Sequence, residues 1–212
     1  MNFPRKSSLA ERCAGLILAG GKSLRMGQSK AMLPFGSEPL LARLVRIVSG
    51  VASPVVVVAA RGQELPTLPD KVQIVYDRHE GRGPLEGLAA GMTALQGKAD
   101  RVYASGCDAP LLSPAFIRRV VERLGERDAA VPQIEGRLHP LAAVYRLSVL
   151  TQVEGMLAED RLKTVSLFDR IKTRVLGPED FADIDPEFHS LLNTNEPHDY
   201  QRALALAGFN PS

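Results

Sequence analysis

The sequence has few of the features that mark secreted, membrane-bound or nucleic-acid-binding proteins. Its 212 residues include only two cysteines, Cys13 and Cys107, too few for a disulfide framework, so we expect both thiols to be reduced. The longest aliphatic run, residues 55–60, is far too short to span a bilayer. The net charge of +2 indicates neither nucleic acid nor an anionic membrane as a partner. We therefore expect a soluble, cytoplasmic protein.

The size and hydrophobic content favour one domain with a substantial core. A chain of 212 residues with a hydrophobic share of 45% can bury enough apolar surface for this. Residues 1–12 mix charged and small polar side chains without the apolar segment of a signal peptide. We interpret residues 1–12 as an N-terminal extension and residues 13–208 as the domain.

Short apolar strands alternate with amphipathic helices in the first half of the chain. Ser113 followed by Pro114 is typical of a helix start, which supports the last of these helices. Such alternation implies a largely parallel sheet with right-handed crossovers. The patterns predict buried strands at 14–18, 55–60 and 72–76, a further strand at 101–105, and helices at 39–49, 85–95 and 114–124.

The second half of the chain is less regular, but it also alternates strand patterns with helix patterns. A break is expected where Asp185 precedes Pro186. The fold class predicted for the whole is α/β: a single three-layer α/β/α domain with a mostly parallel, Rossmann-like mixed sheet. The weaker patterns predict strands at 129–131 and 141–145, a turn at 133–137, and helices at 147–159, 165–171 and 196–206.

A glycine-rich loop at residues 20–27 directly follows the first strand. Parallel α/β sheets bind ligands beyond the carboxyl ends of their strands. Gly20 and Gly21 allow backbone N–H groups to approach an anion, and Ser23 can donate a further hydrogen bond. Arg25 and Lys30 supply charge for a triphosphate. A plain tight turn with solvated basic residues is the alternative, but the accumulation of glycines and cations favours phosphate binding.

Two common phosphate-binding motifs are excluded at this loop. A Walker A motif would need a glycine five positions before Gly21, where the sequence has Leu16. The dinucleotide pattern of three spaced glycines is also absent. The loop is therefore a different kind of phosphate cradle.

Two aspartates follow strands further along the chain. Asp77 follows the third strand, where it could accept hydrogen bonds from a nucleobase or ribose, or serve only in a turn. Asp108 follows the strand at 101–105, where an ionised carboxylate needs a partner such as Mg²⁺. A capping or turn role is the alternative for Asp108 too. Cys107 beside it is expected to be structural, because an adjacent carboxylate disfavours the thiolate.

Residues 18–30 resemble the signature of the molybdenum cofactor guanylyltransferases, which are pyrophosphorylase-like nucleotidyltransferases. The similarity extends to the segments around Asp77, Gly83 and Asp108, and covers nearly the whole chain from Leu16 to Tyr200. It implies catalytic roles for Arg25, Lys30 and Asp108, with Asp108 holding Mg²⁺. The nucleotide-binding residues that it implies are Leu18, Ala19, Gly20, Gly21, Ser23, Lys30, Asp77, Gly83 and Asp108.

Two further segments are similar to the family, one of them with a substitution. His139 and the proline after it resemble an element on the side of the second substrate. Asn193 and Asn195 resemble a C-terminal motif in which Glu196 here replaces a threonine. From the residues alone, we expect Asn195 to cap the last helix rather than to bind a ligand.

The chain departs from the family at the end of the second strand. The family often has an asparagine there that contacts the nucleotide, whereas residues 58–61 read Val-Ala-Ala-Arg. Basic residues within 77–82 could compensate for the lost contact. This departure weakens the case for guanine in particular.

The resemblance implies transfer of GMP from GTP to the terminal phosphate of molybdopterin or the molybdenum cofactor, with release of pyrophosphate. Cytidylyl or other nucleotidyl transfer, to the same or another phosphate acceptor, is an alternative. So is a nucleotide-binding partner protein without turnover. Whether a separate protein delivers the pterin is left open.

Overall fold

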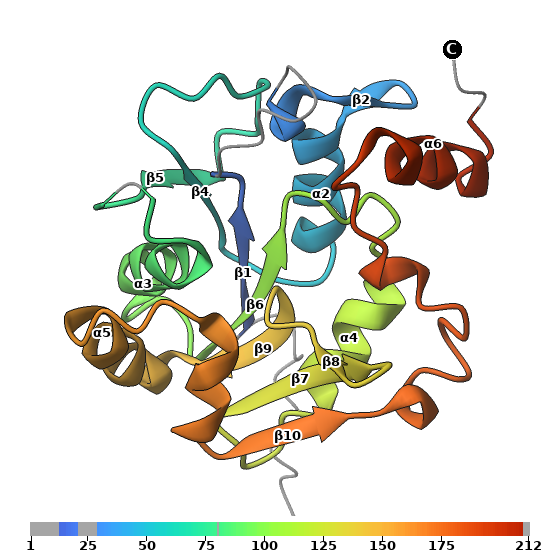
Figure 1. Cartoon of the computed structure of the whole chain (residues 1–212). Coiled ribbons are helices and arrows are strands. Elements are labelled where there is room, and N and C mark those ends of the chain that lie inside the picture. The colour runs from blue at the N-terminus through green and yellow to red at the C-terminus, as the bar shows by residue number, and fades with distance from the viewer. Residues whose placement is uncertain (1–12, 21–28, 80, 210–212) are drawn as a thin grey trace, which may run out of the picture.

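A central sheet runs through the computed structural model, which describes residues 13–20, 29–79 and 81–209 (Figure 1). Within these residues the sheet has eight strands. Seven follow the order β10-β7-β9-β6-β1-β4-β5, and β8 pairs with β7. The proposed extension at 1–12 and loop residues 21–28 lie outside the described residues.

The first four of these strands along the chain form a parallel unit. They are β1 (Cys13–Leu18), β4 (Val55–Ala59), β5 (Gln73–Tyr76) and β6 (Arg101–Gly106). β1 pairs in parallel with β4 on one side and β6 on the other, and β5 pairs in parallel with β4. Parallel pairing needs crossover connections, and helices supply them here.

The other half of the sheet is mixed. β9 (Ala142–Arg146) runs antiparallel to both β6 and β7 (Ala129–Ile134). β8 (Arg137–Leu138) pairs antiparallel with β7, and β10 (Thr173–Leu176) pairs with β7 in parallel. The predicted fold class, a mostly parallel mixed sheet with helices on both sides, is confirmed.

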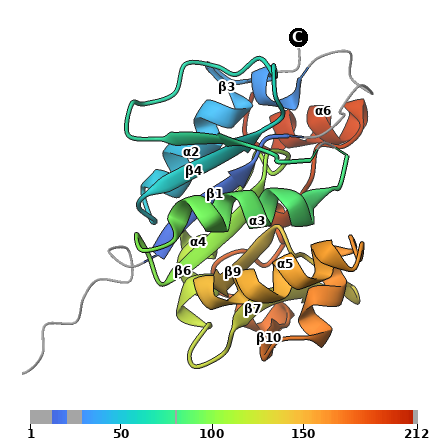
Figure 2. The same cartoon turned by 90° about the vertical axis from the view of Figure 1, so that its left-hand side faces the viewer.

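Helices cover both faces of the sheet. One face carries α2 (Leu40–Ser49), α4 (Pro114–Glu122) and α6 (Pro197–Leu206), and the other carries α3 (Pro84–Leu95) and α5 (Leu150–Ala158). Figure 1 shows the two groups on opposite sides of the sheet, and in Figure 2 α3 and α5 face the viewer. The result is the three-layer arrangement that the alternating pattern predicted.

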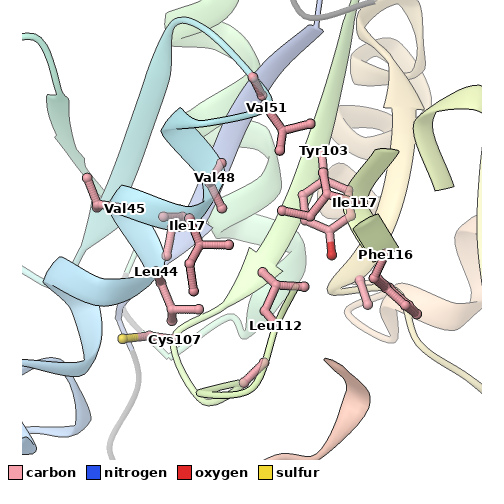
Figure 3. Close-up of a cluster of buried hydrophobic side chains, with 14 of the residues drawn as sticks. Ile17, Leu44, Val45, Val48, Val51, Tyr103, Cys107, Leu112, Phe116 and Ile117 are labelled. Carbon is pink, nitrogen blue, oxygen red and sulfur yellow. The ribbon is translucent and has the colours of Figure 1, made fainter. Parts of the chain in front are cut away.

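Alternation along β1 produces two separate cores. Cys13 and Ile17 pack with the α2 and α4 side, whereas Ala14, Leu16 and Leu18 pack with α3. Figure 3 shows Ile17 and the Tyr103 ring of β6 among side chains of α2 and α4. A strand buried on both faces reads as a continuous apolar run, as β1 does. The sheet is therefore packed on both faces, by one core on each side.

Helix boundaries agree closely with the local signals. Ser113 caps α4, and its Oγ accepts the Phe116 N–H at 3.1 Å. The 3-10 turn η3 (Leu147–Val149) leads into α5, so the predicted helix at 147–159 exists as two joined pieces. The smaller elements are η2 (Lys30–Met32), the two-stranded ribbon β2 (Pro34–Phe35) and β3 (Glu38–Pro39), η5 (Pro178–Asp180) and η6 (His189–Leu191).

Several local predictions are wrong. β5 is an edge strand rather than a buried one, with Ile74 40% and Tyr76 46% exposed, because only the Val75 face packs on a core. The helix predicted at 165–171 is the 3-10 helix η4 (Thr164–Asp169). The turn predicted at 133–137 shrinks to two residues, Glu135 and Gly136, whose positive φ angles suit a tight hairpin.

The two-residue strands β2, β3 and β8 and the longer strand β10 had no counterpart in the predictions. β10 has only four residues, and Val175 in its middle is 51% exposed, so the sequence lacks a clear apolar pattern there. None of the helices in the described residues has the length and apolar character needed to cross a membrane.

Candidate functional site

A cavity of about 640 Å³ opens at the carboxyl ends of β1, β4 and β6, beside the start of α3. This volume is typical of a small-molecule site. Gly21, Ser23 and Arg25 lie outside the described residues. The other seven expected site residues all line the cavity: Leu18, Ala19, Gly20, Lys30, Asp77, Gly83 and Asp108.

The strand register explains why these residues converge. Leu18 stands opposite Val58 of β4 and Gly106 of β6, so the three strands end at the same level. The backbone continues the ladder past the strand ends: the Ala19 N–H donates to Val58 O at 2.8 Å, and the Cys107 N–H donates to Leu18 O at 3.0 Å. The loops after β1, β4 and β6 therefore share one edge of the sheet.

Asp77 lies between two glycines from different parts of the chain. A Cβ on Gly20 would stand 3.1 Å from Asp77 Oδ2, and a Cβ on Gly87 would stand 3.5 Å from Asp77 Oδ1. The Asp77 carboxylate therefore packs closely on Gly20, where a Cβ would make a tight contact, whereas a Cβ on Gly87 would make only an ordinary one. Gly20 follows β1 and Gly87 lies in α3, so the carboxylate faces the cavity between a loop and a helix.

The end of β6 and the C-terminal loop together position Asp108. The side chain of Asp108 folds back over Gly106, where a Cβ would stand 2.5 Å from Asp108 Oδ1. Its backbone oxygen accepts the Thr194 N–H at 2.8 Å and the Thr194 hydroxyl at 3.2 Å. Thr194 is fully buried, which fixes the Asp108 main chain. The carboxylate itself remains 26% exposed in the cavity.

Lys30 reaches across the cavity to residues far along the chain. Its Nζ donates to Asn195 Oδ1 at 2.8 Å and lies 3.7 Å from Asp108 Oδ2. A partly exposed ion pair of this length contributes little to stability, about 0–1 kcal/mol. Its consequence is geometric, since it holds the ammonium group beside the carboxylate.

The prediction that Asn195 caps the last helix is wrong. The N-cap of α6 is Glu196, whose N–H donates to Asp199 Oδ2 at 3.0 Å. The Asn195 side chain is turned instead toward Lys30 and lines the cavity. A lysine partner 165 residues away gives no local sequence signal.

Cys107 fits the structural role predicted for it. It is buried among the side chains of the core on the α2 side (Figure 3), and it also lines the cavity. Burial, together with the smaller effect of the Asp108 charge, raises the pKa of the Cys107 thiol to about 12, although the Lys30 charge partly opposes the rise. A thiol with such a pKa is not a nucleophile at neutral pH.

A second hollow of about 160 Å³ lies beside the first and shares Pro84, Asp108 and Leu141 with it. His139 lines this hollow, on the side where the resemblance implied the second substrate. Burial, and to a lesser extent the Arg137 charge, lowers the pKa of His139, so the neutral imidazole is favoured. Arg137 also lines the hollow. The sequence predicts only a turn at this residue and gives no sign of a site.

The two arginines after Asp77 make their hydrogen bonds away from the cavity. Arg78 donates to Thr93 Oγ1 at 2.8 Å, and Arg82 donates to Leu157 O at 2.6 Å. Neither arginine lines the cavity. At the end of β4 the cavity wall is formed by Val58 and Ala60, so it is apolar where the family often has an amide.

The donor chemistry at Asp108 fits Mg²⁺ better than a metal held by protein ligands alone. In the described parts of the chain, no three His, Cys, Asp or Glu side chains gather closely enough to hold a metal. Mg²⁺ is commonly held by one or two carboxylates, with water and substrate phosphates completing its shell. The partly exposed Asp108 carboxylate, in a cavity large enough for a small molecule, meets that requirement.

The sheet topology and the cavity at the carboxyl ends of the strands are typical of α/β proteins that bind a ligand at this position. The chain belongs to the family of MobA-like NTP transferase domains, which its residues 15–172 match. It is therefore a nucleotidyltransferase by family, as the resemblance at residues 18–30 predicted.

A curated relative agrees with this family, and a solved structure shares the fold. A probable molybdenum cofactor guanylyltransferase of Carboxydothermus hydrogenoformans is 33% identical over 90% of this chain and 94% of its own. The structure of molybdopterin-guanine dinucleotide biosynthesis protein A from Archaeoglobus fulgidus covers 92% of this chain and 98% of its own, with a TM-score of 0.75 and 21% identity.

A cytidylyltransferase has the same fold. The 2-C-methyl-D-erythritol 4-phosphate cytidylyltransferase of Thermus thermophilus covers 92% of this chain and 98% of its own, with a TM-score of 0.69 and 19% identity. The fold alone therefore does not select the base.

Proposed function

We propose that the protein transfers GMP from GTP to the terminal phosphate of molybdopterin or the molybdenum cofactor and releases pyrophosphate. The observation that carries this proposal is the meeting of Lys30 and Asp108, 3.7 Å apart, in a cavity lined by the described residues of the family's nucleotide site. Lys30 begins η2 and Asp108 follows the end of β6, and a cation and a carboxylate placed together at the strand ends suit a triphosphate with its counter-ion.

The reaction is a direct displacement at phosphorus. An oxygen of the acceptor phosphate forms a bond to the α-phosphorus of GTP, and the bond from that phosphorus to the bridging oxygen breaks. Pyrophosphate leaves with the bonding electrons. The protein aligns the two phosphates and neutralises the charge that develops on the leaving group.

Each site residue has a role in this scheme. Lys30 and Arg25 balance the charge of the leaving pyrophosphate, while Leu18, Ala19, Gly20, Gly21 and Ser23 form the loop that holds base and phosphates. Asp77 and Gly83 contact the nucleoside. Asp108 would hold Mg²⁺, which supplies Lewis-acid activation of the phosphate oxygens when bound.

The second hollow suits the acceptor. It adjoins Asp108, and it carries the Arg137 guanidinium, which can pair with a phosphate. An acceptor phosphate held there would approach a nucleotide in the first cavity from the Asp108 side.

Cytidylyl transfer is the nearest alternative, because the apolar wall at Val58 and Ala60 lacks the family's frequent asparagine. Calorimetric titration of GTP, CTP, ATP and UTP with Mg²⁺ distinguishes guanylyl transfer from cytidylyl transfer. We expect GTP to bind most tightly and to yield pyrophosphate when molybdopterin is added. Preference for CTP would move the activity to cytidylyl transfer, and GTP binding without pyrophosphate release would favour a non-catalytic partner protein.

A further inference from the structure

Gln63 makes a set of hydrogen bonds that connects three separate parts of the cavity wall. Its Nε2 donates to Ala19 O at 2.8 Å and to Ser29 Oγ at 3.2 Å. Its Oε1 accepts the Ala60 N–H at 3.0 Å. Both amide hydrogens and the amide oxygen of one side chain are thereby used.

The three partners lie at critical points of the site. Ala19 follows β1 and precedes Gly20, Ser29 precedes Lys30, and Ala60 follows β4. Ala19, Ser29 and Ala60 all line the cavity, whereas Gln63 does not. Gln63 therefore acts from behind the wall, through the residues that face the ligand.

The segment that carries Gln63 is itself held in place. Residues 60–72 form neither helix nor strand, but Leu65 and Leu68 pack against the core on the α2 side. A further backbone hydrogen bond runs from the Gln63 N–H to Ala60 O at 3.2 Å. The side chain is consequently presented from an anchored loop and not from a free one.

We propose that Gln63 is a positioning residue for nucleotide binding. By joining Ala19 to Ser29 it sets the separation of Gly20 and Lys30, the two described ends of the glycine-rich segment. Arranging these groups before the ligand arrives removes part of the ordering cost of binding. The inference rests on the proposed function only in requiring that this cavity takes a nucleoside triphosphate, whatever its base.

This role differs from base recognition in a measurable way. Backbone groups that hold phosphates act on every triphosphate alike, so a positioning residue affects all four nucleotides equally. A side chain that reads the base would affect one nucleotide more than the others. Base preference is therefore the readout that separates the two roles.

The test compares Gln63→Ala, Gln63→Glu and Ser29→Ala with wild type and with Gln152→Ala, an exposed glutamine on α5. Dissociation constants for GTP, CTP, ATP and UTP with Mg²⁺ are measured by calorimetry, with the melting temperature as a check on folding. Each lost hydrogen bond is worth roughly a 2- to 10-fold change in an equilibrium constant. We expect Gln63→Ala to weaken all four nucleotides by about 5- to 20-fold.

The other variants make the test specific. Glutamate keeps an acceptor for the Ala60 N–H, and the Ser29 hydroxyl can donate to it, but its carboxylate cannot donate to Ala19 O and repels that oxygen. Gln63→Glu should therefore also bind all four nucleotides more weakly than wild type. Ser29→Ala removes one bond and should cost about 2- to 5-fold. Adding it to Gln63→Ala should cost little more, because both remove the same bond.

Turnover provides a second check. With the acceptor present, we expect the KM for the nucleotide to rise in Gln63→Ala while kcat falls less. Unchanged dissociation constants, or a loss confined to one base, would overturn the positioning role. If wild type prefers CTP, guanylyl transfer fails, and the role of Gln63 is judged on CTP. If wild type binds no triphosphate, both proposals fail.

Discussion

The Nζ of Lys30 donates a hydrogen bond of 2.8 Å to Oδ1 of Asn195, which lies 165 residues further along the chain. The bond joins the start of η2 to the loop before α6, and both of these segments line the same cavity. The ammonium group has Asp108 as its other close partner, at 3.7 Å. Before a nucleotide binds, Lys30 is thus already directed toward the place where phosphates are expected.

Lys30→Met should lower kcat/KM for nucleotidyl transfer by about 10²–10³-fold, since it removes a main electrostatic stabiliser of the leaving group. Asn195→Ala should cost only about 5- to 20-fold, because it leaves the charge but loosens its direction. If Asn195 acts through Lys30, the double variant will be no slower than Lys30→Met. Steady-state kinetics measure this, with the exposed Lys71→Met as the control. Additive losses would show that Asn195 acts independently.

Asp108→Asn should abolish the metal dependence of nucleotide binding and lower kcat by about 10²–10³-fold. The amide keeps the size of the side chain but not the charge that Mg²⁺ needs. Calorimetry with and without Mg²⁺ measures the first effect, and pyrophosphate release measures the second. Asp70→Asn, at an exposed position that does not line the cavity, is the matched control. A folded Asp108→Asn protein with wild-type turnover would refute the assignment.

Two helical glycines should respond in opposite directions to alanine. A Cβ on Gly91 of α3 would stand 2.2 Å from Leu16 Cδ1 in the buried core, so Gly91→Ala should destabilise the protein by about 1–3 kcal/mol. At Gly155 of α5, no described atom beyond its own helix backbone and chain neighbours lies within 4 Å of the new Cβ. Gly155→Ala should stabilise by about 0.5–1 kcal/mol through helix propensity. Urea unfolding measures both, and equal effects would contradict the packing described.

His139 should make stability depend on pH. Its pKa is lowered in the folded protein, chiefly by burial, from an ordinary value of 6.5. Between the two pKa values the unfolded chain binds more protons, so stability rises with pH there. The stability is complete above about pH 6.5 and is lost as the pH falls through the folded-state pKa.

Replacing the imidazole tests this dependence. His139→Gln should show a smaller fall in melting temperature than wild type between about pH 7.5 and about pH 5. Equal falls in the two proteins would mean that His139 is not the titrating group. Measuring both proteins in the same buffers removes any effect of the buffer itself.

Much of the site could be predicted from local sequence because parallel sheets concentrate their strand ends on one edge. Leu18 and Gly106 end neighbouring strands at the same level, so the loop after β1 and Asp108 had to meet. The same geometry brought Asp77 to the cavity from the edge strand β5.

Other features depend on contacts that carry no local signal. Gln63 lies 44 residues from Ala19 and 34 from Ser29, and nothing around it marks it as part of a binding site. The prediction that Asn195 caps a helix is wrong for a similar reason. An asparagine before a helix is locally a good cap, and the distant partner Lys30 leaves no trace in the nearby sequence. Arg137 was read only as part of a turn, although the hairpin directs it to the second hollow.

The sequence alone determined most positions of the longer strands and helices, the order of the phosphate loop and the two aspartates, and the family itself. They depend on apolar periodicity and on motifs within short segments, which are properties of neighbouring residues. The tertiary structure decided which distant residues contact one another at the cavity and behind its wall: Asn195 with Lys30, Thr194 with Asp108, and Gln63 with Ala19 and Ser29. Those pairings arise from sheet register and loop packing, which bring together residues that no local pattern connects.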